Sequence, residues 1–283
     1  MKLGNGLKAT LFTVIVMINA SIFGLVMKLP GEMYMFAPAI AVLLLMLITG
    51  DLFKRKGWAE LGLHKLGLKY WGFAVIVPIV VLIAAYALLW ATPFASFCMP
   101  EGVTTGMLLF IPVKLLLTTV IYTVTSSLGE EIGWRGYLLP KLAGLGWAKA
   151  LLLVGVIHGV FHFPIMLAGN YHSAGNPWIV VPMFVMSTIF ISVIFGATRI
   201  LTGSVWPAAI LHAVHNIFWA ALGEFTTVTS DAAEYIGGES GIVVLVLYGF
   251  IAFLMLKKLR RQQAVPQRAN GTEKRYSALT GNV

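Results

Sequence analysis

The sequence has few charged residues, and this shortage is the first constraint on its class. Charged side chains make up 11% of the 283 residues, 59% are hydrophobic, and the mean hydropathy is +0.88. Long uncharged runs recur along the whole chain, which a soluble domain of this length does not carry. The runs are continuous rather than alternating, which argues against a transmembrane β-barrel. The composition therefore predicts an all-α fold, a polytopic transmembrane helical bundle.

Cysteine is almost absent. The single cysteine, Cys98, excludes an internal disulfide and any metal cluster built from cysteines. We interpret it as a small packing residue near the end of a helix.

Acidic residues are outnumbered, and the formal net charge is +9. The basic residues cluster beside apolar runs, where cytoplasmic flanks and anionic lipid explain them better than nucleic acid does. We therefore expect a lipid bilayer as partner and no nucleic acid.

The N-terminus has a basic start followed by an apolar stretch, as a signal peptide would. The apolar part, 9–27, is long enough to span a bilayer, and no convincing small-x-small cleavage site follows it. We interpret it as a first transmembrane helix.

Eight candidate spans follow from the apolar runs, and they form one integral membrane domain over 1–256. The polar, basic tail 257–283 contains Pro266 and Gly271 and is predicted to be disordered. The spans are 9–27, 33–50, 70–92, 104–128, 148–169, 178–198, 203–222 and 241–256.

The distribution of lysine and arginine predicts the orientation. Segment 51–69 holds five basic and two acidic residues, and 257–283 holds seven basic and one acidic, whereas 223–240 holds four acids and no base. With eight spans, every basic segment falls on one side, so both termini are predicted to be cytoplasmic. Segment 51–69 is either an amphipathic helix on the inner membrane surface or a solvated connector.

Glu130, Glu131 and Arg135 lie at the end of a long apolar run, in the stretch SSLGEEIGWRGYLLP. On a helix Glu131 and Arg135 share a face and can pair, whereas Glu130 points about 100° away from Glu131. One carboxylate is then held by the arginine and the other stays available for chemistry. The alternative is an ordinary surface ion pair at a helix end.

Two histidines, His158 and His162, lie four apart on one face of the fifth span. Pro164 follows, frees the carbonyl of Val160 and favours a kink. A lone histidine is more often structural, but two on one face of a span favour a functional site.

His212 and Asn216 are also four apart, in the seventh span. Asparagine often joins transmembrane helices by hydrogen bonds, but beside His212 we favour a role in the site. His215 points elsewhere or flanks the site, and we interpret it as a packing residue.

The ordered set E-E-x-x-x-R, a histidine in a following span, and H-x-x-x-N in a later one resembles the CPBP family. This family comprises the CAAX prenyl endopeptidases and Abi-type membrane proteins, which are typically eight-helix bundles. The resemblance covers roughly 126–220 and places the second motif on His162, within FHFP. The family usually has an aromatic residue where this chain has His158, so either Phe161 replaces that aromatic or His158 joins the site.

The resemblance implies an intramembrane endopeptidase acting on a membrane-associated, lipidated or prenylated peptide. Peptide hydrolysis needs an activated water and a stabilised oxyanion. Glu130 is the candidate general base, and Arg135 would hold Glu131. His162 would position the water, and His212 with Asn216 would donate to the oxyanion.

A metalloprotease mechanism is the alternative, since zinc often takes two histidines and one carboxylate. The ligands would be Glu130, His162 and His212, although the H-E-x-x-H arrangement is absent. We prefer the metal-free mechanism, because it explains Asn216.

Two other classes remain open. One is a transporter that relays protons or ions through its membrane-embedded polar residues. The other is a non-catalytic, peptide-binding immunity protein of the same fold. The membrane is expected to be a bacterial or archaeal plasma membrane, or the endoplasmic reticulum in a eukaryote.

Overall fold

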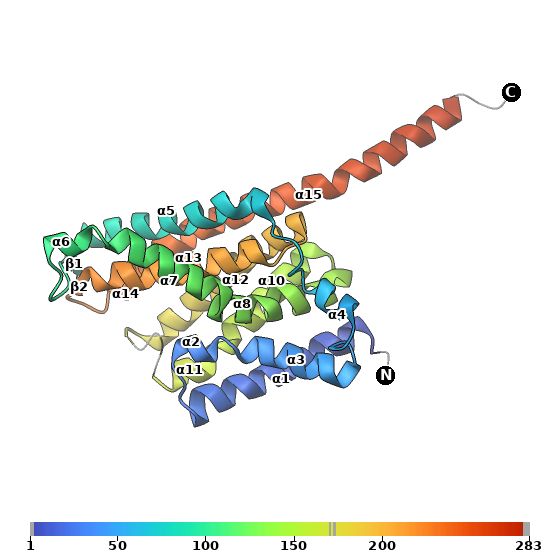
Figure 1. Ribbon diagram of the computed structural model, residues 1–283. Coiled ribbons are helices and arrows are strands. Elements are labelled where there is room, and N and C mark those ends of the chain that lie inside the picture. The colour runs from blue at the N-terminus through green and yellow to red at the C-terminus, as the bar shows by residue number, and fades with distance from the viewer. Residues whose placement is uncertain (1–2, 170, 172–173, 280–283) are drawn as a thin grey trace.

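Helices make up most of the molecule, as the composition predicts (Figure 1). The structure, a computed structural model, describes residues 3–169, 171 and 174–279, and for 105 and 263–279 it describes the backbone alone. The α-helices are α1 (Asn5–Ser21), α2 (Gly31–Tyr34), α3 (Ala37–Thr49), α4 (Arg55–Glu60), α5 (Trp71–Trp90), α6 (Thr105–Leu108), α7 (Ile111–Val124), α8 (Ser126–Glu131), α9 (Leu139–Leu142), α10 (Trp147–Phe161), α11 (Phe163–Leu167), α12 (Pro177–Thr202), α13 (Trp206–Glu224), α14 (Ala233–Ile236) and α15 (Ile242–Leu279). Two short strands, β1 (Ala95–Phe97) and β2 (Thr226–Val228), pair antiparallel.

Seven helices in the described part of the chain are long and apolar enough to cross a membrane. They agree with the predicted fold class and with seven of the eight predicted spans. They are Asn5–Val26, Gly31–Thr49, Leu68–Trp90, Gly106–Leu145, Trp147–Leu167, Pro177–Thr202 and Ile242–Gln262.

The seventh predicted span, 203–222, forms α13 but is not among these seven helices. Its two histidines and one asparagine lower its hydropathy. The helix nevertheless lies inside the bundle, where it packs against α5, α7, α8 and α12. A helix shielded by its neighbours needs less apolar surface than one that faces lipid.

The predicted connector, 51–69, contains little α-helix, whereas the predicted tail, 257–283, is helical as far as Leu279. In segment 51–69 the only α-helix is α4, six residues long with none buried, which favours a solvated connector over a long amphipathic helix. Helix α15 continues without a break to Leu279, so the backbone does not separate the last span from the predicted tail. The disordered state of 257–283 stays a prediction, and 280–283 lie outside the described residues.

The basic connectors meet at one end of the bundle. Lys8 contacts Asp51 at 3.0 Å and Lys141 contacts Glu60 at 2.9 Å. The hydrogen bond from Lys8 holds the pKa of Asp51 well below its ordinary value. Arg199 Nη2 donates to the Glu60 carbonyl at 2.8 Å, so this end is cross-linked by contacts between distant segments.

Helix breaks place the polar motifs inside the bundle. The chain kinks at Thr125 (φ −116°, ψ −102°), between α7 and α8. Straight after α8 the helix widens into a π-helical turn over Ile132–Leu138. Such turns inside α-helices are often found at functional sites, because they re-aim side chains. The two glutamates therefore end α8, and Arg135 lies in the wider turn.

Candidate active site

The first motif is buried, which contradicts the alternative of a surface ion pair. Glu130, Glu131 and Arg135 are each at most 1% exposed. Arg135 Nη1 donates to Glu131 Oε1 at 2.8 Å, so the predicted pair is confirmed. Removing either partner of a buried ion pair leaves an uncompensated charge at a cost of several kcal/mol, so the two charges are expected to stay paired.

The two adjacent glutamates take different partners, as their angular separation predicts. Glu130 Oε2 accepts from Trp134 Nε1 at 3.2 Å and lies 2.9 Å from His158 Nε2. Its other oxygen, Oε1, has no hydrogen-bond partner among the described residues. One oxygen of this carboxylate is thus fixed and the other is left as an acceptor.

Glu131 connects the first motif to the third. Its Oε1 accepts from Arg135 and also lies 2.9 Å from His212 Nδ1. Because the carboxylate accepts the proton on Nδ1, Nε2 is the ring nitrogen of His212 that is left to face the cavity. Glu131 therefore acts as a structural link between α8 and α13.

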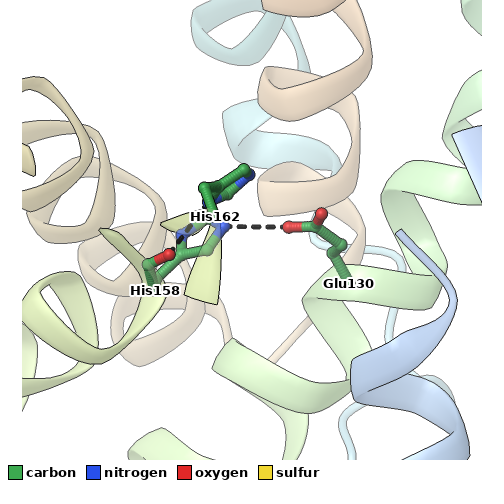
Figure 2. A group of neighbouring side chains, drawn as sticks. All are labelled: Glu130, His158 and His162. Carbon is green, nitrogen blue, oxygen red and sulfur yellow. Dashed lines mark hydrogen bonds and ion pairs between the residues drawn. The ribbon is translucent and has the colours of Figure 1, made fainter. Parts of the chain in front are cut away.

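His158 and His162 lie close to Glu130, at the end of α10 (Figure 2). One potential ligand atom from each of the three residues lies within 4.8 Å of the others. His162 Nδ1 is 3.0 Å from the carbonyl oxygen of His158, so that ring nitrogen donates and Nε2 carries the lone pair. The sequence does not decide whether His158 joins the site. In the structure His158 is the histidine in direct contact with Glu130.

This triplet fits a zinc site by its donor set, two histidines and one carboxylate. The sequence predicts His212 as the third ligand, but the structure groups His158 with Glu130 and His162 instead. His212 turns its Nδ1 to Glu131.

The motifs line a common cavity of about 240 Å³. Glu130, His162, His212 and Asn216 all contribute to its wall. One water needs roughly 10–15 Å³ of volume measured in this way, so the cavity has room for several waters. Asn216 Nδ2 is 3.9 Å from Met35 Sδ, a weak contact for an amide donor.

Several other wall residues have no counterpart in the sequence analysis. Tyr34 donates from its hydroxyl to the Phe161 carbonyl, and Tyr122 donates to Glu32 at 2.8 Å.

Glu239, which also lines the cavity, belongs to the acidic segment 223–240, whose glycines and charges are typical of an exposed loop. Nothing in its local sequence distinguishes it from the exposed acids around it.

The chain was compared with models of known protein families. Residues 112–218 match the Rce1-like family of type II CAAX prenyl endopeptidases. The Rce1-like match confirms the resemblance to CAAX proteases and contains every predicted site residue, from Glu130 to Asn216. It supports a CAAX-type intramembrane protease in general, and the seven apolar helices agree with an integral membrane protein. A search of curated proteins finds no match to the chain.

Proposed function

We propose that this protein is an intramembrane endopeptidase that hydrolyses a peptide bond in a membrane-associated peptide or protein. The observation that carries the proposal is the buried Glu130, which has one oxygen fixed by Trp134 and His158 and the other left as an acceptor on a shared cavity. Prenylated CAAX peptides, named in the family description, are the substrate class to test first.

Glu130 would act as the general base. Its free oxygen would take a proton from a water as the water oxygen attacks the peptide carbonyl. The same carboxyl would then return the proton to the amine as the carbon–nitrogen bond breaks. His162, with its Nε2 lone pair facing the cavity, would accept a hydrogen bond from the water and orient it.

His212 and Asn216 would stabilise the oxyanion. The side-chain amide of Asn216 is a donor in any protonation state, whereas His212 Nε2 donates only when the imidazole is protonated. The Glu131 carboxylate beside Nδ1 stabilises that protonated form. Removing one oxyanion donor typically costs about 10²–10³ in kcat.

Zinc, if bound, would be held by Glu130, His158 and His162 and would supply a water of lowered pKa. We favour the metal-free mechanism, because it uses Glu130 as a base and gives Asn216 a role. Cleavage measured before and after chelation, together with the metal content of the protein, decides between the two.

The proposal is tested in cells by comparing membrane fractions that contain wild-type protein or Glu130→Gln. Glutamine keeps the size of the side chain but cannot act as a base, so uncleaved precursor peptides should accumulate with the variant. Mass spectrometry of peptide termini identifies them. Equal sets of termini in both fractions, at equal protein levels, would contradict the proposal.

A further inference from the structure

A second buried carboxylate, Glu239, lies on the wall of the same cavity. It is 9% exposed and comes from the connection between α14 and α15. This position lies outside the matched segment 112–218 and outside the three motifs. The mechanism proposed above gives it no role, although burying a carboxylate is costly without partners.

Tyr171 lies between Glu239 and His162 and contacts both side chains. Its hydroxyl donates to Glu239 Oε2. Burial, together with the Glu239 charge, raises the pKa of Tyr171 well above its ordinary value, so the hydroxyl keeps the proton that it donates. The ring of Tyr171 stacks on that of His162, with centroids 5.6 Å apart and planes 26° apart.

The ring of His162 is therefore restrained from several directions. Its Nδ1 donates to the His158 carbonyl, which opposes a flip of the ring about the Cβ–Cγ bond. Phe184 meets the ring edge to face at 5.1 Å. Tyr171 covers a face of the ring, so its position decides where Nε2 points.

Glu239 also faces the helix that carries the third motif. Its Oε1 lies 3.6 Å from His215 Nε2, and His215 Nδ1 lies 2.8 Å from the Tyr248 hydroxyl. His215 immediately precedes Asn216 on α13. A chain of polar contacts thus runs from α15 through α13 and Glu239 to Tyr171 and the face of His162.

We propose that Tyr171 and Glu239 are positioning residues for the hydrolysis, an inference that rests on the proposed function. Glu239 holds the Tyr171 hydroxyl, and the tyrosine ring holds the His162 imidazole in the orientation that places the water. Neither side chain exchanges a proton with the substrate. The pair acts on the reaction through the geometry of His162.

The test uses the full-length protein in liposomes and a membrane peptide that the wild-type protein cleaves, with prenylated CAAX peptides tried first. Tyr171→Phe removes the hydroxyl and keeps the ring, so we expect kcat to fall about tenfold or more with little change in KM, since a shift of ~1 Å in a catalytic group costs about a hundredfold. Glu239→Ala should lose a similar factor. Glu239→Gln should retain more activity than Glu239→Ala, because its amide oxygen still accepts from Tyr171.

A double-mutant cycle separates positioning from general damage. The double variant Tyr171→Phe/Glu239→Ala should have about the activity of the less active single variant, because each substitution removes the same Tyr171–Glu239 hydrogen bond. Tyr137→Phe is the matched control, since that buried hydroxyl has no partner among the described residues. Equal kcat for Tyr171→Phe and the control, or losses that multiply fully in the double variant, would overturn the inference.

A different result would contradict the proposed function itself. If Glu130→Gln cleaves the peptide at the wild-type rate, the assigned base is wrong whatever Tyr171 does. If Glu130→Gln is inactive while the Tyr171 and Glu239 variants match wild type, only the positioning network is wrong.

Discussion

At the scale of single residues, the site is built from charges that are paired before any substrate binds. Glu131 holds both Arg135 and His212, and the ring of Phe195 lies 5.1 Å from the arginine carbon Cζ. The pairing of Glu131 with Arg135 followed from their spacing in the sequence. The contact between Glu131 and His212 did not, because it joins residues 81 positions apart and depends on how α8 meets α13.

Removing the arginine should therefore destabilise the fold. Arg135→Ala leaves the Glu131 carboxylate buried without its cation, and breaking a buried pair in this way costs about 3–5 kcal/mol. Denaturant unfolding in detergent measures the change. Lys141→Ala, which breaks a contact with the exposed Glu60, is the control and should cost about 1 kcal/mol or less. A loss as small for Arg135→Ala would mean that the pair contributes little.

At the scale of helices, Gly155 lets α10 pack closely against α12, and this packing positions His158 and His162 at the end of α10. Gly155 lies on α10 one turn before His158, and a Cβ added there would meet Ile189 Cα of α12 at 2.7 Å. Small residues let transmembrane helices approach closely, which gives strong packing without polar side chains. The sequence predicts α10 and α12 as spans, but it does not identify this contact between them.

Gly155→Ala should therefore push α10 away from α12. We expect a loss of about 1–3 kcal/mol in stability, the usual cost of an overpacked core, and a fall in cleavage as His158 and His162 move. Gly144→Ala is the control, because a Cβ there meets nothing within 4 Å. Thermal unfolding and peptide cleavage are measured on both variants. Unchanged stability and activity in Gly155→Ala would show that the two helices are not tightly coupled.

At the scale of the whole molecule, the apolar runs were enough to predict the fold class and seven membrane-spanning helices. Helix α13 departs from that pattern because its interior position allows His212, His215 and Asn216 to replace apolar residues. Glu239 was missed for the opposite reason, since an acidic, glycine-containing segment is typical of solvent-exposed loops. Long-range packing, which a single sequence does not encode locally, decides both cases.

The distribution of basic residues predicts that both termini face the cytoplasm. Cys98, next to β1 and past the far end of α5, should then react with a membrane-impermeant maleimide only from the outside. In a Cys98→Ala background, Lys56→Cys should react only from the inside, because 51–69 belongs to the basic end. Labelling in sealed vesicles of known orientation measures both. The reverse pattern would invert the topology and place the basic connectors outside.

The central claim is that Glu130 activates the water that cleaves the peptide bond. The most direct measurement is the single-turnover cleavage rate of a precursor peptide by purified, liposome-reconstituted wild type, Glu130→Gln and the control Glu60→Gln. The account predicts a loss of about 10²–10⁴ for Glu130→Gln, the usual contribution of a general base, and a wild-type rate for Glu60→Gln. A folded Glu130→Gln protein that cleaves the peptide within about threefold of the wild-type rate, a change of well under 1.4 kcal/mol in the barrier, would contradict it.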